Sequence, residues 1–163
     1  MLIYLKNKNK LIIDDFVFKC SLGKGGTTNN KIEGDLKTPI GKYEIGSLYY
    51  RADRIQKIFT KLKKIKIKKK IGWCNDINSK KYNKKMKISK KYKYEKLFRN
   101  DYKYDLLIPI KYNYKKTIPG KGSAIFLHLT KNYKPTSGCV AISKNDFFIL
   151  LRLINNKTKI IIY

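Results

Sequence analysis

The chain has 163 residues, 42% of them hydrophobic, which suits one ordinary packed domain, residues 1–163, rather than two. No stretch approaches the roughly 18 consecutive apolar residues of a membrane-spanning helix, which argues against a transmembrane anchor. The formal net charge of +28 comes almost entirely from lysine and has two interpretations. It could attract an anionic polymer, or it could reflect an AT-biased genome that inflates Lys, Asn, Ile and Tyr together.

The N-terminal segment gives no sign of an export signal. MLIYLKNKNK contains a short apolar run broken by lysines, and the next run, LIIDDFVF, contains Asp14 and Asp15. A secretory signal has an uninterrupted apolar core. We therefore expect no signal peptide here.

Several short runs rich in β-branched and aromatic residues predict strands, and turns such as GKGGTTNN and IPGKGS separate many of them. The predicted strands are Leu2–Leu5, Leu11–Cys20, Gly41–Tyr50, Asp105–Lys111, Ser123–Thr130, Cys139–Ile142 and Lys157–Tyr163. One helix is predicted in the C-terminal part, between the last two of these strands. Ser143 can cap it, Asp146 occupies its third position, and Phe147, Leu150 and Leu151 recur at helical spacing. The fold class is therefore mainly β (β+α).

The middle of the chain is rich in lysine and harder to interpret. Eight of the fourteen residues from Lys57 to Lys70 are lysine, which fits either a solvated edge strand or a disordered loop. Lysines then alternate with tyrosines through Tyr82, Tyr92 and Tyr104. Such a pattern can bind single-stranded nucleic acid through charge and stacking. β-rich proteins also bury tyrosines in their cores, and we favour this structural interpretation.

The three cysteines, Cys20, Cys74 and Cys139, are far apart and include no CxxC pair. With a single histidine in the chain, neither a zinc site nor a disulfide scaffold is expected. Cys20 and Cys74 lie in apolar surroundings that suit buried packing thiols. Cys139 differs because it follows the turn PTSG.

His128 and Cys139 form the constellation that could carry chemistry. The strand SAIFLHLT contains His128, and PTSGC ends in Cys139 eleven positions later. A thiol needs an adjacent imidazole or local positive potential to become a nucleophile. Gly138 permits a tight turn whose main-chain N–H groups could stabilise an oxyanion. Taken alone, one histidine and one cysteine in such positions are more often ordinary core residues.

The surrounding residues resemble the L,D-transpeptidase (YkuD) family. GSAIFLHL followed by PTSGCVAIS is similar to its active-site block, and EGDLKTPIGKYEI is similar to a segment near the start of its domain. GWCND and YDLLIPIKYN resemble a short, stand-alone branch. These blocks cover roughly Cys20 to Leu153 in the right order.

The resemblance implies a single L,D-transpeptidase-like β-sandwich domain with a helix after the catalytic cysteine. It implies that Cys139 is the nucleophile and His128 the general base. Gly138 and Cys139 would supply oxyanion donors, and Ser137 and Thr136 belong to the same turn; Thr136 could equally cap that turn.

The sequence also departs from the family. Ser137 stands where the commonest motif has histidine, and Ala141 and Ile142 stand where an arginine is usual. The spacing between histidine and cysteine is also shorter than in the common form. These departures leave the Cys/His pair intact but put the classical cross-linking substrate in doubt.

The implied function is cysteine-dependent acyl transfer on peptidoglycan stem peptides through a Cys139 thioester, with no metal and no cofactor. One alternative is an L,D-carboxypeptidase that hydrolyses peptides containing D-amino acids. A basic nucleic-acid-binding protein is the alternative of another class, although we expect no stable nucleic-acid complex. We expect a monomer whose lysine-rich surface could meet an anionic polymer. The family implies the cell envelope, whereas the missing signal is compatible with the cytoplasm.

Overall fold

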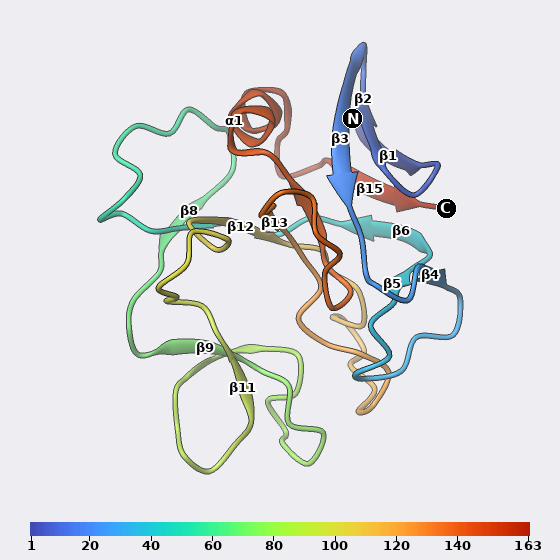
Figure 1. Ribbon diagram of the computed structural model, residues 1–163. Helices are drawn as coiled ribbons and strands as arrows, with labels where there is room; N and C mark the ends of the chain where they lie inside the picture. Colours follow the sequence, from blue (N-terminus) through green and yellow to red (C-terminus); the bar gives the residue numbers. More distant parts are fainter.

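The computed structural model describes all 163 residues and contains fifteen strands and one helix (Figure 1). In chain order these are β1 (Leu2–Lys6), β2 (Lys10–Ile13), β3 (Phe16–Ser21), β4 (Thr27–Thr28), β5 (Thr38–Pro39), β6 (Gly41–Glu44), β7 (Leu48–Tyr50), β8 (Lys64–Lys66), β9 (Ile71–Cys74), β10 (Lys85–Lys87), β11 (Tyr94–Lys96), β12 (Leu106–Pro109), β13 (Phe126–Leu129), β14 (Val140–Ile142), α1 (Lys144–Leu153) and β15 (Lys159–Ile162). The sequence prediction of a mainly β fold with a helix after Cys139 is confirmed.

Ten strands form one large curled sheet in the order β6-β15-β1-β2-β3-β14-β13-β12-β7-β8. Near its centre, β13 pairs with β14 in parallel and with β12 in antiparallel orientation. A separate sheet has the order β10-β9-β11, and β4 pairs with β5. Figure 1 shows β9 and β11 on the opposite side of the molecule from the N-terminal strands.

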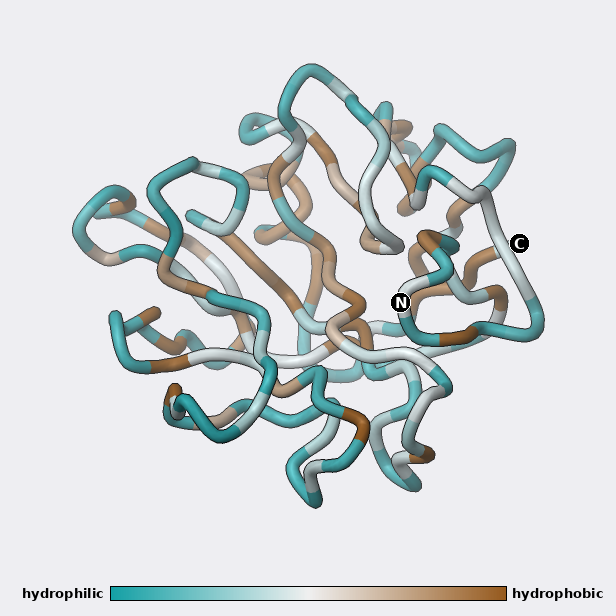
Figure 2. The backbone as a smooth tube through the Cα atoms, turned by 60° about the horizontal axis from the view of Figure 1, so that its bottom comes forward, coloured by the Kyte–Doolittle hydropathy of each residue, from teal (hydrophilic) through white to brown (hydrophobic).

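Both faces of the central strands are buried, so the sheet separates two apolar clusters. Leu127 and Leu129 of β13 belong to a core of 25 residues, whereas Phe126 belongs to a cluster of eight with Trp73 and Cys139. Alternate residues of a strand point to opposite faces, which explains why all four residues of β13 are buried. Figure 2 shows the hydrophobic segments inside and hydrophilic ones along the outer loops.

Helix α1 begins and packs as its sequence predicts. Ser143 accepts a hydrogen bond from the Asp146 N–H at 3.1 Å, which satisfies one of the free donors of the first turn. Phe147, Leu150 and Leu151 are fully buried in the larger core, and each contributes about 1.5–3 kcal/mol by leaving water. At ten residues, this helix is too short to cross a membrane, and it is the only helix of the protein.

Two of the predicted strands are wrong in extent because each contains a turn. The predicted strand Leu11–Cys20 is divided into β2 and β3, where Asp14 adopts a φ of 47°. The predicted strand Gly41–Tyr50 is divided into β6 and β7 around Gly46, which lies against the ring of Pro109. Runs of β-branched and aromatic residues conceal such turns because the turn residues are few.

The lysine-rich middle forms ordered strands. Lys64–Lys66 is β8, which pairs with β7 at the edge of the large sheet, so the edge-strand interpretation is confirmed. The sheet of β9, β10 and β11 was not predicted, because lysines at the exposed positions hide the few buried residues. Tyr82 and Tyr104 are buried, as are Cys20 and Cys74.

Candidate active site

The β-sheet register brings His128 and Cys139 to the same face. His128 of β13 is aligned with Ala141 of β14, and Cys139 lies two residues before Ala141. Two-residue spacing keeps a side chain on one face, and neighbouring strands lie about 4.8 Å apart, so the Cα atoms of His128 and Cys139 are separated by about 8 Å.

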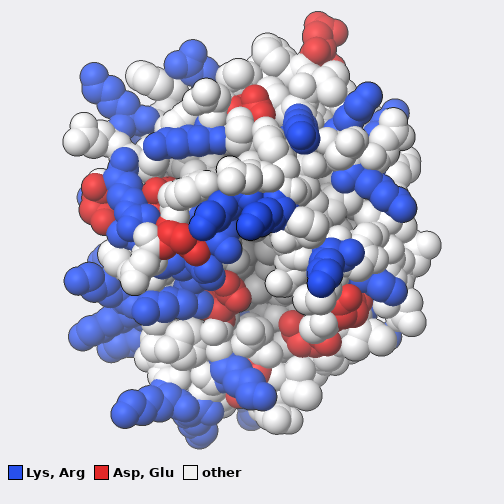
Figure 3. Space-filling view, in the orientation of Figure 1, with Lys and Arg blue, Asp and Glu red and all other residues white.

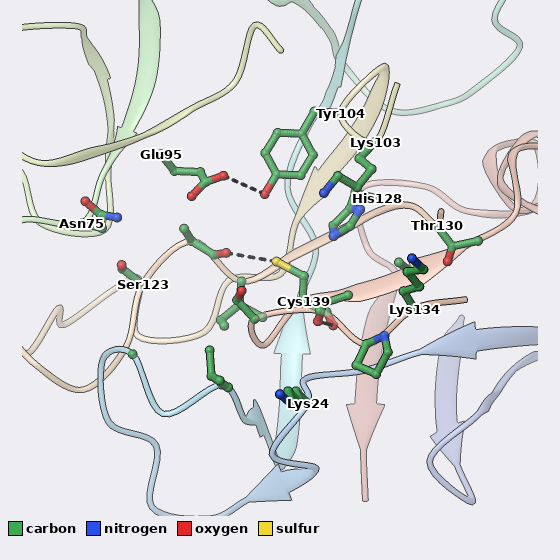
Figure 4. A pocket seen from close by; sticks show the side chains of 18 of the residues that line it. Lys24, Asn75, Glu95, Lys103, Tyr104, Ser123, His128, Thr130, Lys134 and Cys139 are labelled. Carbon is green, nitrogen blue, oxygen red and sulfur yellow. Dashed lines mark hydrogen bonds between the residues drawn. The ribbon is translucent and has the colours of Figure 1, made fainter. Parts of the chain in front are cut away.

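Both side chains line one cavity of about 650 Å³ (Figure 4). Thr136 and Ser137 line the same cavity, and Ser137 is exposed at its rim. Cys139 lines this cavity and is 8% exposed, so the residue is largely enclosed. The structure therefore brings four of the five residues singled out from the sequence to one cavity.

The hydrogen bond of His128 determines which ring nitrogen is available. Nδ1 lies 2.9 Å from the Leu129 carbonyl oxygen. Because a carbonyl oxygen only accepts, Nδ1 carries the hydrogen and Nε2 of the neutral ring has a free lone pair. Burial lowers the pKa of His128 to about 4, so the ring is neutral at pH 7.

The Cys139 thiol is also neutral. Its S–H donates to the Ala124 carbonyl at 3.3 Å, and its sulfur accepts from the Phe126 N–H at 3.3 Å. Burial raises the pKa of Cys139 to about 12, although the Phe126 N–H acts in the opposite direction. The two side chains share no hydrogen bond, and both are uncharged at rest.

The PTSG turn holds the cysteine through Thr136. Thr136 Oγ1 donates to the Cys139 carbonyl at 2.6 Å and accepts from the Gly138 N–H at 3.1 Å. The Gly138 N–H is therefore engaged by Thr136, whereas the Cys139 N–H makes no hydrogen bond. Thr136 caps its own turn, one of the two roles considered for it.

Gly138 is required by its conformation and its neighbours. Its φ is +136°, and a Cβ at this position would lie 2.8 Å from the Lys37 carbonyl oxygen. A side chain would be strained by the backbone angle and would also collide with the main chain. Only glycine fits without a shift of the turn.

The upstream motif supports this turn from behind. The Thr136 N–H donates to the Leu22 carbonyl at 2.7 Å, and the Lys24 N–H donates to the Thr136 carbonyl at 2.9 Å. Gly23 N–H in turn donates to the Oγ1 of Thr38 at 3.0 Å. Thus the TPIG segment is distant in sequence but holds the loop on which the cysteine turn rests.

A group of side chains packed beside His128 forms a wall of the site that the sequence analysis did not identify. The Tyr104 ring packs edge-on against the His128 ring, with centroids 5.1 Å apart. The Tyr104 hydroxyl donates to Glu95 Oε1 at 3.1 Å, and Arg99 pairs with Glu95 and Asp101. Tyr104 begins the block YDLLIPIKYN, but neither Tyr104 nor its partner Glu95 was given a role in the site from the sequence.

No group of three or more His, Cys, Asp or Glu side chains is arranged to hold a metal ion. The cavity that His128 and Cys139 line has the volume that a peptide segment needs.

Three comparisons with known proteins bear on the fold. A sequence model of the L,D-transpeptidase catalytic domain (YkuD) matches residues 1–162. No curated protein sequence matches the chain. Among solved structures, the chain resembles the helical cell shape determining protein Pgp2 from Campylobacter jejuni, with a TM-score of 0.55 and 19% identity. That likeness covers 99% of this chain and 46% of Pgp2, and it supports the fold alone.

Proposed function

The chain belongs to the L,D-transpeptidase catalytic domain (YkuD) family, and we propose that it transfers acyl groups of peptidoglycan stem peptides through a thioester on Cys139. The observation that carries this proposal is the shared cavity. His128 lies on β13, Cys139 directly precedes the paired parallel strand β14, and both residues line the same 650 Å³ cavity.

The first chemical step begins from two neutral groups. The S–H bond of Cys139 turns from the Ala124 carbonyl toward His128, and the proton passes to Nε2 as sulfur attacks the peptide carbonyl. Concerted transfer suits this site because a thiol with a pKa of about 12 and an imidazole with a pKa of about 4 do not form a stable ion pair. The C–S bond forms, and the carbonyl oxygen becomes an oxyanion.

The oxyanion needs main-chain donors. The free Cys139 N–H is the first candidate, whereas the Gly138 N–H would have to leave Thr136 Oγ1 to contribute. A positioned donor of this kind is worth about 2.7–4 kcal/mol in the transition state of acyl transfer.

Collapse of the oxyanion breaks the amide C–N bond, and His128 returns its proton to the leaving amine. The thioester then reacts with an amine of a neighbouring stem, which gives a cross-link. His128 accepts the amine proton and passes it to the departing Cys139 sulfur, which restores the neutral thiol and the neutral imidazole. Water in place of the amine gives an L,D-carboxypeptidase.

Incubation of the purified protein with a tetrapeptide stem, with and without an acceptor amine, tests this function. We expect release of the terminal amino acid and, when the acceptor is present, an amide-linked product identified by mass. If the acceptor never enters the product but the terminal residue is still released, the protein is a hydrolase. If no terminal residue is released under either condition, the proposed function is wrong.

The nucleic-acid alternative depends on charge alone. Figure 3 shows Lys and Arg side chains over much of one face, with acidic groups between them. The tyrosines of the interleaved segment that would have to stack on bases include the buried Tyr82 and Tyr104. No observation of the site favours this second function.

A further inference from the structure

The N-terminal part of the large sheet has one face in the core and one face in solvent. The buried hydrophobic residues of β1, β2, β3 and β15 belong to the larger core. The residues between them point the opposite way and are exposed or half-buried. Figure 1 shows these four strands at the right of the view, with α1 to their left. We examine the solvent side of these strands, which we name the outer face.

The register of the strands aligns four apolar side chains on the outer face. Tyr4 of β1 is paired with Ile161 of β15 on one side and with Ile12 of β2 on the other. Ile12 is in turn paired with Val17 of β3. Paired residues of neighbouring strands point to the same face, so the four form one unbroken row, which we name the apolar row. Val17 is 60% exposed, and the other three are half-buried.

A row of lysines runs beside the apolar row. Lys6, Lys10 and Lys19 each lie two residues along their strand from a member of that row, and Lys10 is paired with both of the others. All three are exposed, and none makes an ion pair. Asp14 and Asp15 lie in the turn between β2 and β3, outside both rows. The lysine row is therefore a line of uncompensated positive charge.

Both rows are unfavourable in water. Like charges directly opposite each other in neighbouring strands repel, and apolar side chains left in water forgo the free energy of burial. A partner that places anionic groups beside an apolar layer would relieve both costs. The interface of an anionic lipid bilayer has this layering, and long lysine stems let the ammonium groups stay at the level of the phosphates.

We propose that the outer face docks on the surface of an anionic lipid bilayer. The ammonium groups of the lysine row would pair with lipid phosphates, while Ile12 and Val17 would enter the boundary between headgroups and acyl chains. Tyr4 suits the same depth, because tyrosine is enriched at membrane interfaces. The inference is independent of acyl transfer and can fail or succeed separately from it.

Two other occupants fit the outer face less well. A second copy of this chain would bring its own lysine row into the contact, and the two rows would repel each other. A single-stranded nucleic acid would satisfy the lysines, but it gains affinity by stacking its bases on aromatic rings. Only Tyr4 of the four residues in the apolar row is aromatic, and the other three are aliphatic.

The first test is sedimentation of the full chain with vesicles of phosphatidylcholine, with and without phosphatidylglycerol. We expect binding only when the anionic lipid is present. The triple variant Lys6→Gln, Lys10→Gln and Lys19→Gln should weaken this binding by about 100-fold, since each lysine at such a surface is worth about fivefold. Thermal unfolding checks that each variant is folded.

The matched control removes the same charge elsewhere. Lys64 and Lys66 of β8 and Lys87 of β10 are also exposed and unpaired, and β8 lies at the opposite end of the sheet order from the outer face. Their joint replacement by glutamine should cost less than about fivefold, because charges away from the contact are screened by salt. Equal losses in the two triple variants would reduce the binding to net charge and overturn the inference.

A second pair of variants tests the apolar row at constant charge. Ile12→Thr with Val17→Thr keeps β-branched side chains in both strands and should weaken vesicle binding by about 10-fold. Ile77→Thr with Ile118→Thr alters two similarly exposed residues outside the row, at 50% and 57% exposure, and should bind as the wild type does.

Val17→Trp reports the contact directly. The chain's own Trp73 is 3% exposed and gives a constant background. We expect the emission of the Val17→Trp variant to shift to the blue on anionic vesicles, and that of Ile77→Trp to stay unchanged. No binding of the wild type to anionic vesicles, or no shift for Val17→Trp, overturns the inference. Tighter binding to a single-stranded oligonucleotide than to vesicles, unaffected by the Ile12 and Val17 changes, would assign the outer face to nucleic acid and overturn it as well.

Discussion

Cys20 and Cys139 have similar thiol acidity but very different surroundings. The two lie in neighbouring segments, with Cys20 of β3 opposite Ile142 of β14. Both are nearly buried, at 3% and 8% exposure, and burial raises the pKa of each to about 12. Cys20 packs in the large apolar core, whereas Cys139 opens on the cavity that His128 also lines. Position beside a base and a substrate space, rather than thiol acidity, distinguishes the proposed nucleophile.

The largest expected effect comes from replacing Cys139 by alanine, with the same change at Cys20 as the comparison. Cys139→Ala should lower acyl transfer by at least about 1,000-fold, because a residue that bonds covalently to the substrate has no substitute. Cys20→Ala should keep activity and lose about 1 kcal/mol of stability. Release of the terminal amino acid measures activity, and thermal unfolding measures stability. Equal activity losses would remove the distinction between them.

His128→Ala tests whether the nearby base is what distinguishes Cys139 from Cys20. We expect a loss of about 100- to 10,000-fold in kcat/KM, typical for removal of a general base. Circular dichroism at the assay temperature checks that the fold is retained, because the His128 ring is buried against Tyr104. A variant with wild-type turnover would mean that Cys139 is activated by another group.

The neutral pair predicts a particular pH dependence. Burial lowers the pKa of His128 from 6.5 to about 4, so its neutral form contributes stability above pH 6.5 that is lost as pH falls toward 4. The contribution is about 3 kcal/mol. Activity should stay flat from about pH 5 to 9, and unfolding should become easier below about pH 6. NMR titration of the only imidazole is the direct measurement; a pKa near 7 contradicts this account.

Gly138→Ala probes the turn that orients the thiol. The added Cβ would lie 2.8 Å from the Lys37 carbonyl oxygen, so the turn must shift, at a cost of about 1–3 kcal/mol. Gly120→Ala is the control, because Gly120 also has a positive φ but has open space around its Cβ position. Activity should fall in the first variant only. Similar losses in both would reduce the effect to backbone strain.

Tyr104→Phe should have the smallest effect. It keeps the ring against His128 and removes only the hydroxyl that donates to Glu95. We expect a fall in kcat of a few fold, about 1 kcal/mol for one hydrogen bond. Tyr102→Phe, at an exposed position among the same lysines, should be silent. A loss from the Tyr102 change as large as that from the Tyr104 change would contradict a specific role for the Tyr104 hydroxyl.

The sequence predicted that His128 and Cys139 share a site, but not the wall beside them. That prediction depended on the resemblance of the surrounding blocks to the family, because one histidine and one cysteine alone are weak evidence. Thr136 was assigned two roles, and only the coordinates show its bonds to Gly138 and Cys139. Glu95 and Tyr104 come from a segment with eighteen lysines and three acidic residues between Lys57 and Tyr104. There, charge at the exposed positions hides which few residues are buried.

The central claim is that Cys139 forms a thioester with a peptide. Brief incubation with excess tetrapeptide stem, acid quenching and peptide mapping by mass spectrometry test it directly. We predict the mass of the acyl fragment on the Cys139 peptide, absent in Cys139→Ala and unchanged in Cys20→Ala. Turnover with no adduct on Cys139, or an adduct on Cys20 or Cys74 instead, would contradict the account.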